Sequence, residues 1–403
     1  MRFRAASTLA VILFLTVSAA AASEKTLFTF LDNTTGVYPY GGVTVVSQGN
    51  VYGTTTLGGS GNGIVFELKH SNGVWNEDVI YQFAGGNDGS GPTTALVFGP
   101  NGHLYGTTYS GGKYGAGTVF DLKRSNGIWH ERIIHTFDGT HGLAPFGDLI
   151  FDSRGSLYGT TQLGGIKSQS CTDEYCGVVF ELSPSTDGNW KYTILHRFTG
   201  GRDGGSPQAG LVFDAAGNLY GSAYAGGASG GGVIFELSPQ SDGTWKETTL
   251  HSFTGRGKDG AYPSFRPILD DAGNIYGTTQ VGGVGGSGIV FKLSPSKSKW
   301  PETVLYSFTG GSDGGVPIAG VTLGPNGVLY GTVNQDVNGF GGVFELKSSS
   351  HGWVETVLYG FMGGADGANP IAGIWLDSAG NLFGATYGDG ESQTFGSVFE
   401  VVP

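Results

Sequence analysis

Asp148 and Arg266 are the residues of this sequence best suited to chemistry, because both stand at a position that is otherwise small. The position lies three residues after a proline that recurs seven times along the chain. The other five copies have glycine or alanine there, namely Gly42, Ala95, Gly210, Gly320 and Gly373. A carboxylate and a guanidinium on nearby copies can form a charge-assisted pair, which is the interpretation we favour. The alternative is a pair that orients a ligand, with Phe146 and Phe265 as apolar walls.

A second group of carboxylates belongs to a recurring Gly-Gly-x-Asp-Gly segment and its variants. Its members are Asp88, Asp203, Asp259, Asp313 and Asp366, with His141 and Thr35 in the two remaining copies. An aspartate before a glycine usually accepts hydrogen bonds from its own turn, and we favour that role over a cation or sugar site. Glycine-rich calcium repeats return every nine residues or so, whereas this motif returns once per repeat. We therefore expect no bound metal and no cofactor.

Cys171 and Cys176 are the two cysteines of the chain, and they lie in the longest loop of any repeat, residues 163–177. An even pair this close in sequence predicts a disulfide in an oxidising compartment. Zinc is the weaker alternative, because two thiols do not fill its usual set of four ligands.

Other arrangements typical of catalysis lack the structure that the chemistry needs. Residues 227–231 have the spacing of a nucleophile elbow, and residues 283–288 that of a dinucleotide fingerprint, but neither is followed by a helical pattern. Three histidines share one slot of the repeat with tyrosines, so we interpret them as packing residues with a polar edge. The slot contains His135, His196 and His251, and Tyr81, Tyr306 and Tyr359 in other copies. No residue is assigned a catalytic role.

These side chains must be positioned by a repeated unit of 53 to 62 residues. In every copy, 13 residues separate the proline from a tyrosine or phenylalanine. The fourth copy has four runs typical of strands (209–213, 218–224, 232–237 and 245–253), and no window shows a helical period. Repeats of four antiparallel strands predict an all-β protein, a seven-bladed β-propeller. The blades start near Pro39, Pro92, Pro145, Pro207, Pro263, Pro317 and Pro370, in a single domain of residues 23–403.

The two ends of the chain predict how the ring closes. The last repeat has only three runs, whereas residues 25–30 form a lone run of the fourth type. Phe28 and Phe30 stand there where Tyr81 and Phe83 stand in the first repeat. We predict that this run becomes the outer strand of the last blade, which removes an open sheet edge.

Composition and the first residues bear on location and partners. The net charge is -12, and an acidic surface repels phosphate backbones, so we expect no nucleic acid partner. Residues 1–22 carry Arg2 and Arg4, then an apolar run and small residues, which is the pattern of a signal peptide. No later stretch is long and apolar enough to span a bilayer. We expect a mature chain that is monomeric and is secreted or periplasmic.

The recurring strings Gly-Gly-x-Asp-Gly-x-x-Pro, Asn-Leu-Tyr-Gly-Thr-Thr and Gly-x-Val-Phe-Glu-Leu resemble the GloVer (Gloeo-Verruco) tandem-repeat family. The resemblance covers essentially all of residues 23–403. It implies an exported bacterial repeat protein with a propeller fold, often carried to the cell surface by a C-terminal anchor, and no assigned biochemical activity. The anchor is not visible in this sequence, which favours the periplasm or the medium.

Loop lengths indicate which face of the propeller carries the function. The turn between the first and second strands keeps one length in all copies, whereas the second-to-third loop and the link between blades vary. Variable loops on a rigid frame are the usual place for binding. The leading hypothesis is a non-enzymatic module that binds a polysaccharide, peptide or protein on this Gly-rich face. The alternatives are a carbohydrate-active hydrolase or lyase that uses acidic residues near the channel, such as Asp148, and a structural component of the cell envelope.

Overall fold

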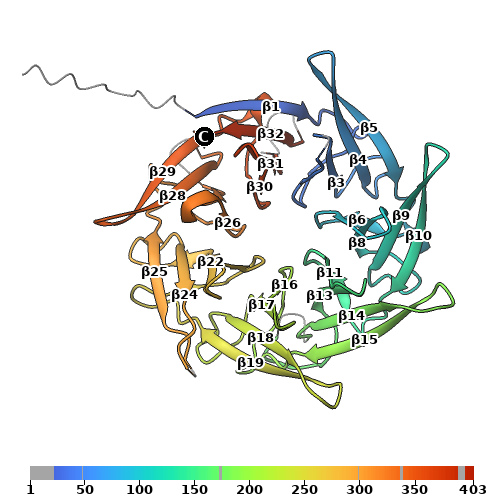
Figure 1. Ribbon diagram of the computed structural model, residues 1–403. Helices are drawn as coiled ribbons and strands as arrows, with labels where there is room; N and C mark the ends of the chain where they lie inside the picture. Colours follow the sequence, from blue (N-terminus) through green and yellow to red (C-terminus); the bar gives the residue numbers. More distant parts are fainter. Residues whose placement is uncertain (1–21, 48, 172–174, 298, 336–338, 389–394) are drawn as a thin grey trace, which may run out of the picture.

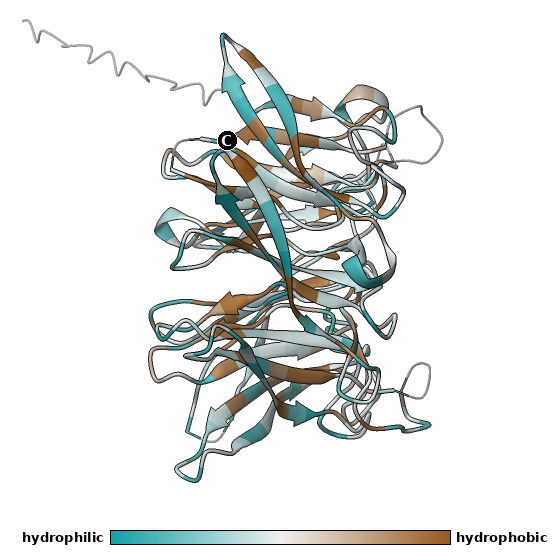
Figure 2. Cartoon of the chain, turned by 90° about the vertical axis from the view of Figure 1, so that its right-hand side faces the viewer, coloured by the Kyte–Doolittle hydropathy of each residue, from teal (hydrophilic) through white to brown (hydrophobic). Residues whose placement is uncertain are grey.

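The computed structural model describes residues 22–47, 49–171, 175–297, 299–335, 339–388 and 395–403. The expected signal peptide lies outside this part of the chain, except for Ala22. Seven antiparallel sheets stand in a circle around a central channel, and β16 and β30 lie near its axis (Figure 1). The view from the side shows the ring edge-on, with loops on both of its faces (Figure 2). The fold is therefore the predicted seven-bladed β-propeller.

Blades 1 to 3 have one pattern, in which the chain moves outward from the channel strand by strand. Blade 1 consists of β2 (Thr44–Val45), β3 (Val51–Thr55), β4 (Ile64–Ser71) and β5 (Val74–Gln82). Blade 2 consists of β7 (Val97–Phe98), β8 (Leu104–Ser110), β9 (Thr118–Ser125) and β10 (Ile128–Thr136), with β6 (Ser90–Pro92) also paired to β8. Blade 3 consists of β12 (Ile150–Phe151), β13 (Leu157–Leu163), β14 (Val178–Pro184) and β15 (Trp190–Arg197), with β11 (Leu143–Pro145) also paired to β13.

Blades 4 to 6 repeat this order. Blade 4 consists of β16 (Val212–Phe213), β17 (Leu219–Ala223), β18 (Val233–Pro239) and β19 (Trp245–Ser252). Blade 5 consists of β21 (Ile268–Leu269), β22 (Ile275–Thr279), β24 (Ile289–Leu293) and β25 (Glu302–Ser307), and a short ribbon pairs β20 (Gly260–Ala261) with β23 (Val281–Gly282). Blade 6 consists of β26 (Thr322–Leu323), β27 (Leu329–Val333), β28 (Gly342–Ser349) and β29 (Gly352–Gly360).

Blade 7 is built from both ends of the chain. It consists of β30 (Trp375–Leu376), β31 (Leu382–Thr386), β32 (Ser397–Val402) and β1 (Ser23–Thr29) as its outer strand. Phe28 pairs with Val398, in the same register in which Tyr81 of β5 pairs with Val65 of β4. The predicted closure is therefore confirmed. Helix in the described residues is limited to the 3-10 turns η1 (Gly86–Asp88), η3 (Pro325–Gly327) and η4 (Gly364–Asp366), and none is long or apolar enough to cross a membrane.

Inside each blade, a glycine of the second strand makes room for a phenylalanine of the third. Gly221 pairs with Phe235, and a Cβ on Gly221 would lie 2.4 Å from the Phe235 ring. The same pairing recurs as Gly53–Phe66, Gly106–Phe120, Gly159–Phe180, Gly277–Phe291, Gly331–Phe344 and Gly384–Phe399. This packing explains the Tyr-Gly-Thr and Phe-Glu-Leu strings of the repeat.

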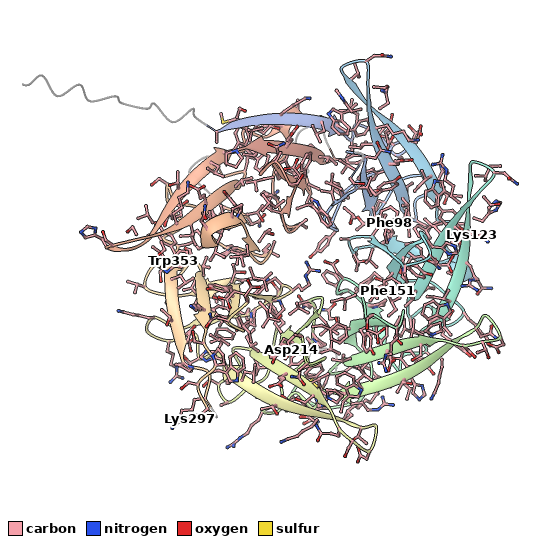
Figure 3. All side chains as sticks on the ribbon, in the orientation of Figure 1. Phe98, Lys123, Phe151, Asp214, Lys297 and Trp353 are labelled. Carbon is pink, nitrogen blue, oxygen red and sulfur yellow. A yellow bond between two sulfur atoms is a disulfide. The ribbon has the colours of Figure 1, made fainter. Side chains whose placement is uncertain are left out.

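Neighbouring blades meet through a second phenylalanine, which follows the outer strand of the preceding blade. Ring centroids in these pairs lie 5.1 to 5.3 Å apart, in edge-on or tilted geometry. The pairs are Phe30–Phe66, Phe83–Phe120, Phe137–Phe180, Phe198–Phe235, Phe253–Phe291, Phe308–Phe344 and Phe361–Phe399. Side chains fill the space between blades, and lysines such as Lys123 and Lys297 lie at the outer edge (Figure 3). The hydrophobic core is thus divided among the seven junctions between blades.

The innermost strands are shorter than the sequence predicts. The first run of the fourth copy was expected over residues 209–213, but β16 covers only Val212–Phe213. The carbonyl of Ala209 instead accepts a hydrogen bond of 2.8 Å from Thr160 Oγ1 in the preceding blade. The chain therefore enters the sheet only after it has passed the channel entrance, because the carbonyl of Ala209 serves the contact between blades.

Candidate functional site

The variable loops and the links between blades lie on one face, which we call the link face. Gly91, in the link between blades 1 and 2, donates its N–H to Asn62 O in the β3–β4 loop at 2.9 Å. The residue before the repeat proline makes this kind of contact at every junction, including Tyr38 N to Phe395 O at 2.9 Å, where blade 7 meets blade 1. The face predicted to carry function is thus a continuous ring of hydrogen-bonded loops.

The aspartates of the links are held by their own turns. Asp313 accepts hydrogen bonds from Thr309 N at 2.9 Å and from Tyr306 Oη at 3.1 Å. Asp366 does the same with Met362 N at 2.8 Å and Tyr359 Oη at 3.0 Å. Equivalent hydrogen bonds in the other links join Asp88 to Ala84 and Tyr81, Asp203 to Thr199 and His196, and Asp259 to Thr254, while His251 lies 3.5 Å from Asp259 without a hydrogen bond. In these contacts the aspartate accepts hydrogen bonds from its own turn, which is the role that the sequence favours.

His141, which replaces the aspartate in one link, is itself bound to an aspartate. Its backbone N–H donates to Asp138 Oδ1 at 2.7 Å, and its Nδ1 lies 2.8 Å from Asp138 Oδ2. Thr35 likewise donates its N–H to Asp32 Oδ1 at 3.2 Å. The turn aspartate is therefore present in these links at a shifted position, and the link carboxylates do not converge on one ligand site.

Hydrogen bonds set the charge state of these carboxyl groups. Partial burial alone would raise the pKa of Asp203, but hydrogen bonds from His196 and Thr199 outweigh it and hold the pKa below its usual value. In Asp313, burial is likewise outweighed by the bonds from Thr309 and Tyr306, so its pKa is also lowered. Both groups are ionised at neutral pH and stabilise their turns.

A cavity on the axis lies where the link face opens into the central channel. It has a volume of about 240 Å³. One residue from each blade, always the residue after the repeat proline, contributes to its wall, and all seven are partly exposed. This entrance ring comprises Tyr40, Thr93, Phe146, Gln208, Ser264, Ile318 and Ile371. The cavity therefore has a mixed aromatic, aliphatic and polar lining, as is usual for small-ligand sites.

Aromatic rings are grouped on one side of this entrance. The Phe146 ring lies edge-on to Tyr40 at 5.1 Å and to Tyr109 at 6.1 Å between centroids. Tyr40 also meets Tyr387 edge-on at 5.9 Å. Tyr109 keeps 39% of its surface exposed. These rings offer flat apolar surface next to the cavity.

Asp148 and Arg266 stand two residues further along the chain than the entrance ring. Both line the first cavity and also a second one of about 370 Å³, so they lie between the two cavities. Gly210 separates them, since a Cβ there would lie 3.1 Å from Asp148 Cβ and 3.3 Å from Arg266 Cδ. The small residues at this position thus leave room for one long side chain inside the channel.

The expected direct pair between Asp148 and Arg266 is not formed. Asp148 Oδ1 accepts a hydrogen bond from Ala95 N at 2.9 Å, whereas the guanidinium of Arg266 has no hydrogen bond or ion pair with any described residue. Burial raises the pKa of Asp148, although the positive charge of Arg266 and the bond from Ala95 act in the opposite direction. The two groups therefore interact electrostatically without a direct contact. The N–H donors of the Arg266 guanidinium remain free.

Phe146 and Phe265 line the first cavity, as predicted for walls beside the charged pair. Phe265 is buried and covers Gly277 of its own blade and Gly320 of the next, where an added Cβ would lie 2.0 and 2.4 Å from its ring. Tyr40 and the polar residues of the entrance ring were missed. They could have been found from the sequence, because each residue of the entrance ring directly follows the repeat proline.

The two cysteines form the predicted disulfide, with their Cα atoms 5.2 Å apart. Cys176 is completely buried in the junction between blades 3 and 4, where it packs with Phe198. Cys171 lies against the following link, since a Cβ on Gly200 would come within 2.3 Å of its Sγ. The bridge therefore attaches the long β13–β14 loop to the link face.

Together, the fold and the channel define a seven-bladed β-propeller with a ligand-sized cavity at the mouth of its channel. The chain belongs to the Gloeobacter/Verrucomicrobia repeat family, whose model matches residues 10–172 and 165–399. This match confirms the resemblance to the GloVer repeats. No curated protein matches the sequence significantly.

Solved structures show the same fold at low sequence identity. An ancestral GH74 enzyme has a TM-score of 0.58 and 11% identity, over 92% of this chain and 48% of the enzyme. The extracellular domain of a protein named as a one-component system from B. thetaiotaomicron has a TM-score of 0.52 and 12% identity, over 92% of this chain and 40% of that one. A protein named as a gluconolactonase has a TM-score of only 0.43 and 18% identity, over 80% and 92% of the two chains, which is too low a score to show the same fold. At these identities the likeness concerns the fold alone.

Proposed function

We propose that this protein is an exported, non-enzymatic binding module that holds the end of an oligosaccharide in the channel mouth on its link face. The observation that carries the proposal is the cavity of about 240 Å³ with aromatic rings on one side and Arg266, whose guanidinium is free, in its lining. Sugar rings present apolar faces that stack on aromatic side chains, and hydroxyl groups that need donors and acceptors. The channel mouth offers both kinds of surface.

Polar groups around the cavity have hydrogen-bonding capacity left for a ligand. Thr93 Oγ1 is buried and has no hydrogen-bond partner in the described structure, and the amide of Gln208 makes no hydrogen bond to a described residue. Gln280 Nε2, by contrast, donates to Ser264 Oγ at 2.9 Å, which fixes the orientation of that amide. A polar ligand in the mouth would therefore meet both free and pre-oriented groups.

Export of the chain is supported by the disulfide, since such bonds persist in oxidising compartments, and by the signal-peptide pattern of residues 1–22. The enzymatic alternative is less well supported. Most glycoside hydrolases need two carboxyl groups on either side of the scissile bond, and among the described residues that line the cavity Asp148 is the one carboxylic acid. Its raised pKa suits an acid, but no partner base stands beside it.

The proposal is tested by screening the protein against a panel of oligosaccharides and then titrating the best ligand into channel variants. Arg266→Ala and Tyr40→Ala should each weaken binding by on the order of tenfold or more, as truncation of anchor residues does at binding sites. Arg154→Ala is the matched control, because Arg154 lies in a β12–β13 turn, paired with Asp152 at 2.9 Å, away from the link face. Equal affinity of both channel variants and the wild type, or release of a shortened sugar product, would contradict the proposal.

A further inference from the structure

A cluster of potential metal ligands lies outside the channel, at the outer junction of blades 4 and 5. His251 belongs to β19, Asp259 to the link that follows it, and Glu302 begins β25 of the next blade. One ligand atom from each residue lies within 4.8 Å of the other two. No other group of three or more histidines, cysteines and acids in the described part of the chain has this spacing.

The surrounding structure orients two of the three groups. Asp259 Oδ2 accepts hydrogen bonds from Thr254 N at 2.7 Å and Thr254 Oγ1 at 2.6 Å. This fixes the carboxylate so that Oδ1 lies 3.5 Å from His251 Nε2. The imidazole ring packs edge-on against Phe253, with centroids 4.6 Å apart. Both groups are thus held in place before any ligand binds.

Each of the three residues has a buried atom with no hydrogen-bond partner. These atoms are His251 Nε2, Asp259 Oδ1 and Glu302 Oε1. Buried polar atoms are nearly always hydrogen-bonded, so three unsatisfied atoms of complementary chemistry at one place require a physical explanation. No Lys or Arg side chain of the described residues forms an ion pair with either carboxylate. A cation bound between the three atoms would satisfy all of them at once.

Equivalent junctions in the same ring show how the repeat satisfies the histidine and aspartate positions without a cation. Between blades 3 and 4, both oxygens of Asp203 accept hydrogen bonds from Thr199, and Glu247 Oε1 accepts one from Thr249 Oγ1 at 2.9 Å. Between blades 5 and 6, a tyrosine hydroxyl replaces the histidine and donates to the link aspartate at 3.1 Å, whereas Glu355 Oε1, at the position of Glu302, is also buried without a hydrogen-bond partner. The junction of blades 4 and 5 differs because its histidine and its aspartate each leave a buried atom without a hydrogen-bond partner beside the glutamate, and such local departures are expected at functional sites.

We propose that His251, Asp259 and Glu302 bind a divalent transition-metal ion, with Zn²⁺ as the best fit. Zinc accepts imidazole nitrogen and carboxylate oxygen at about 2.0 to 2.2 Å, which places tetrahedral ligand atoms roughly 3.4 Å apart. The 3.5 Å between His251 Nε2 and Asp259 Oδ1 matches this separation. Ca²⁺ fits poorly, because it takes six to eight oxygen ligands.

Three protein ligands leave one coordination position for water or another molecule. The His251 and Asp259 side chains keep 19% and 16% of their surface exposed, so solvent reaches the edge of the cluster. The site is separate from the channel mouth, and its existence does not depend on the proposed function. It departs from the expectation that His251 serves packing alone and that the chain binds no metal.

The test is calorimetric titration of untagged, chelator-treated protein with Zn²⁺, which should show one tightly bound ion per chain. His251→Tyr inserts the residue that Tyr306 and Tyr359 place in the same slot of other blades, so the fold accommodates it. This variant should lose at least about tenfold in Zn²⁺ affinity, because even changes around metal ligands cost about 10- to 100-fold. Glu302→Gln, which is nearly isosteric, should weaken binding to a similar extent.

His196→Tyr is the matched control, because it makes the same change at the junction where both oxygens of Asp203 and Oε1 of Glu247 already accept hydrogen bonds. It should leave Zn²⁺ binding unchanged. Substitution with Co²⁺ gives a second readout, since the wild type should show the strong visible absorption of tetrahedral cobalt and His251→Tyr should not. Absence of saturable binding, or unchanged affinity in both His251→Tyr and Glu302→Gln, would overturn the proposal; the latter would place the ion at a surface pair such as His141 and Asp138.

Discussion

Phe30 packs against Phe66 with ring centroids 5.3 Å apart. Phe30 follows β1 at the start of the chain, and Phe66 lies in β4 of blade 1. Since β1 is also the outer strand of blade 7, this contact joins the last blade to the first. The other six junctions contain the same phenylalanine pair within continuous sequence, so the closure repeats an ordinary blade contact with a strand taken from the other end of the chain.

Loss of this contact should destabilise the whole ring. Phe30 is completely buried, so Phe30→Ala removes a large core side chain, and we expect a loss of about 3 to 5 kcal/mol in the free energy of unfolding. Leu31→Ala is the control, because Leu31 is 61% exposed and its truncation should cost little stability.

Deletion of residues 25–30, which form most of the closing strand, should abolish soluble expression. Denaturant unfolding and expression trials measure both effects, and a truncated protein that melts like the full chain would contradict the closure.

Steric fit inside a blade gives a second prediction. Gly221→Ala places a Cβ 2.4 Å from the buried Phe235 ring, and such overpacking typically costs 1 to 3 kcal/mol. Gly373→Ala is the control, because no atom lies within 4 Å of the added Cβ and Ala95 already stands at the same position of blade 2. The difference between the two variants in thermal unfolding checks the prediction. Equal melting temperatures would mean that the Phe235 ring moves aside freely.

The architecture could be predicted from the sequence because several patterns within the repeat indicate the same fold. The proline-to-tyrosine spacing, the glycine opposite Phe235 and the lone strand at residues 25–30 all depend on local patterns. The proposed zinc ligands could not be predicted in this way. His251, Asp259 and Glu302 occupy ordinary positions of the repeat, and what distinguishes them is that all three have a buried atom without a hydrogen-bond partner at one place, a property of side-chain geometry across two blades.

Backbone strain before the repeat proline leads to a third prediction. Val316 has a φ of 52°, a left-handed conformation that costs a residue with a side chain about 1 to 2 kcal/mol. Its N–H donates to Ser287 O at 2.8 Å, and glycine would keep this bond. After the entropy cost of glycine, Val316→Gly should stabilise the protein by about 0.5 kcal/mol.

Val328→Gly is the matched control for this change, because Val328 has a φ of -67° and no strain to release. It should destabilise the protein, whereas Val316→Gly should not. The two midpoints of chemical denaturation decide the matter. If both glycine variants lose stability equally, the left-handed conformation at Val316 carries no strain.

The disulfide should stabilise one loop and leave the ring independent of it. Cys171→Ser combined with Cys176→Ser removes the attachment of the β13–β14 loop to the Gly200 link, so proteases should cut between Leu163 and Gly177 more readily. The β13–β14 ladder and the Phe137–Phe180 contact do not involve sulfur. We therefore expect an unchanged circular dichroism spectrum. A variant that unfolds as a whole would show that the bridge supports the junction of blades 3 and 4 itself.

Burial of Glu131 in β10 predicts a dependence of stability on pH. Its Oε1 atom is buried without a hydrogen-bond partner, and burial, with smaller contributions from the charges of Asp88 and Asp121, raises its pKa from 4.5 to about 8. Between these two values the folded protein holds a proton that the unfolded chain releases. The stabilisation from this group is therefore complete below pH 4.5 and is lost as the pH rises through about 8.

Glu131→Gln places a neutral amide at this position at every pH, so its stability should fall less between pH 4.5 and 8 than that of the wild type. The variant should equal the wild type near pH 4.5 and exceed it above pH 8, where the wild type buries a carboxylate close to Asp88 and Asp121. Asp271→Asn, at an exposed position, controls for the loss of one surface charge. Urea unfolding across this range measures the difference, and parallel curves for Glu131→Gln and the wild type would show that Glu131 is ionised in the folded protein at neutral pH.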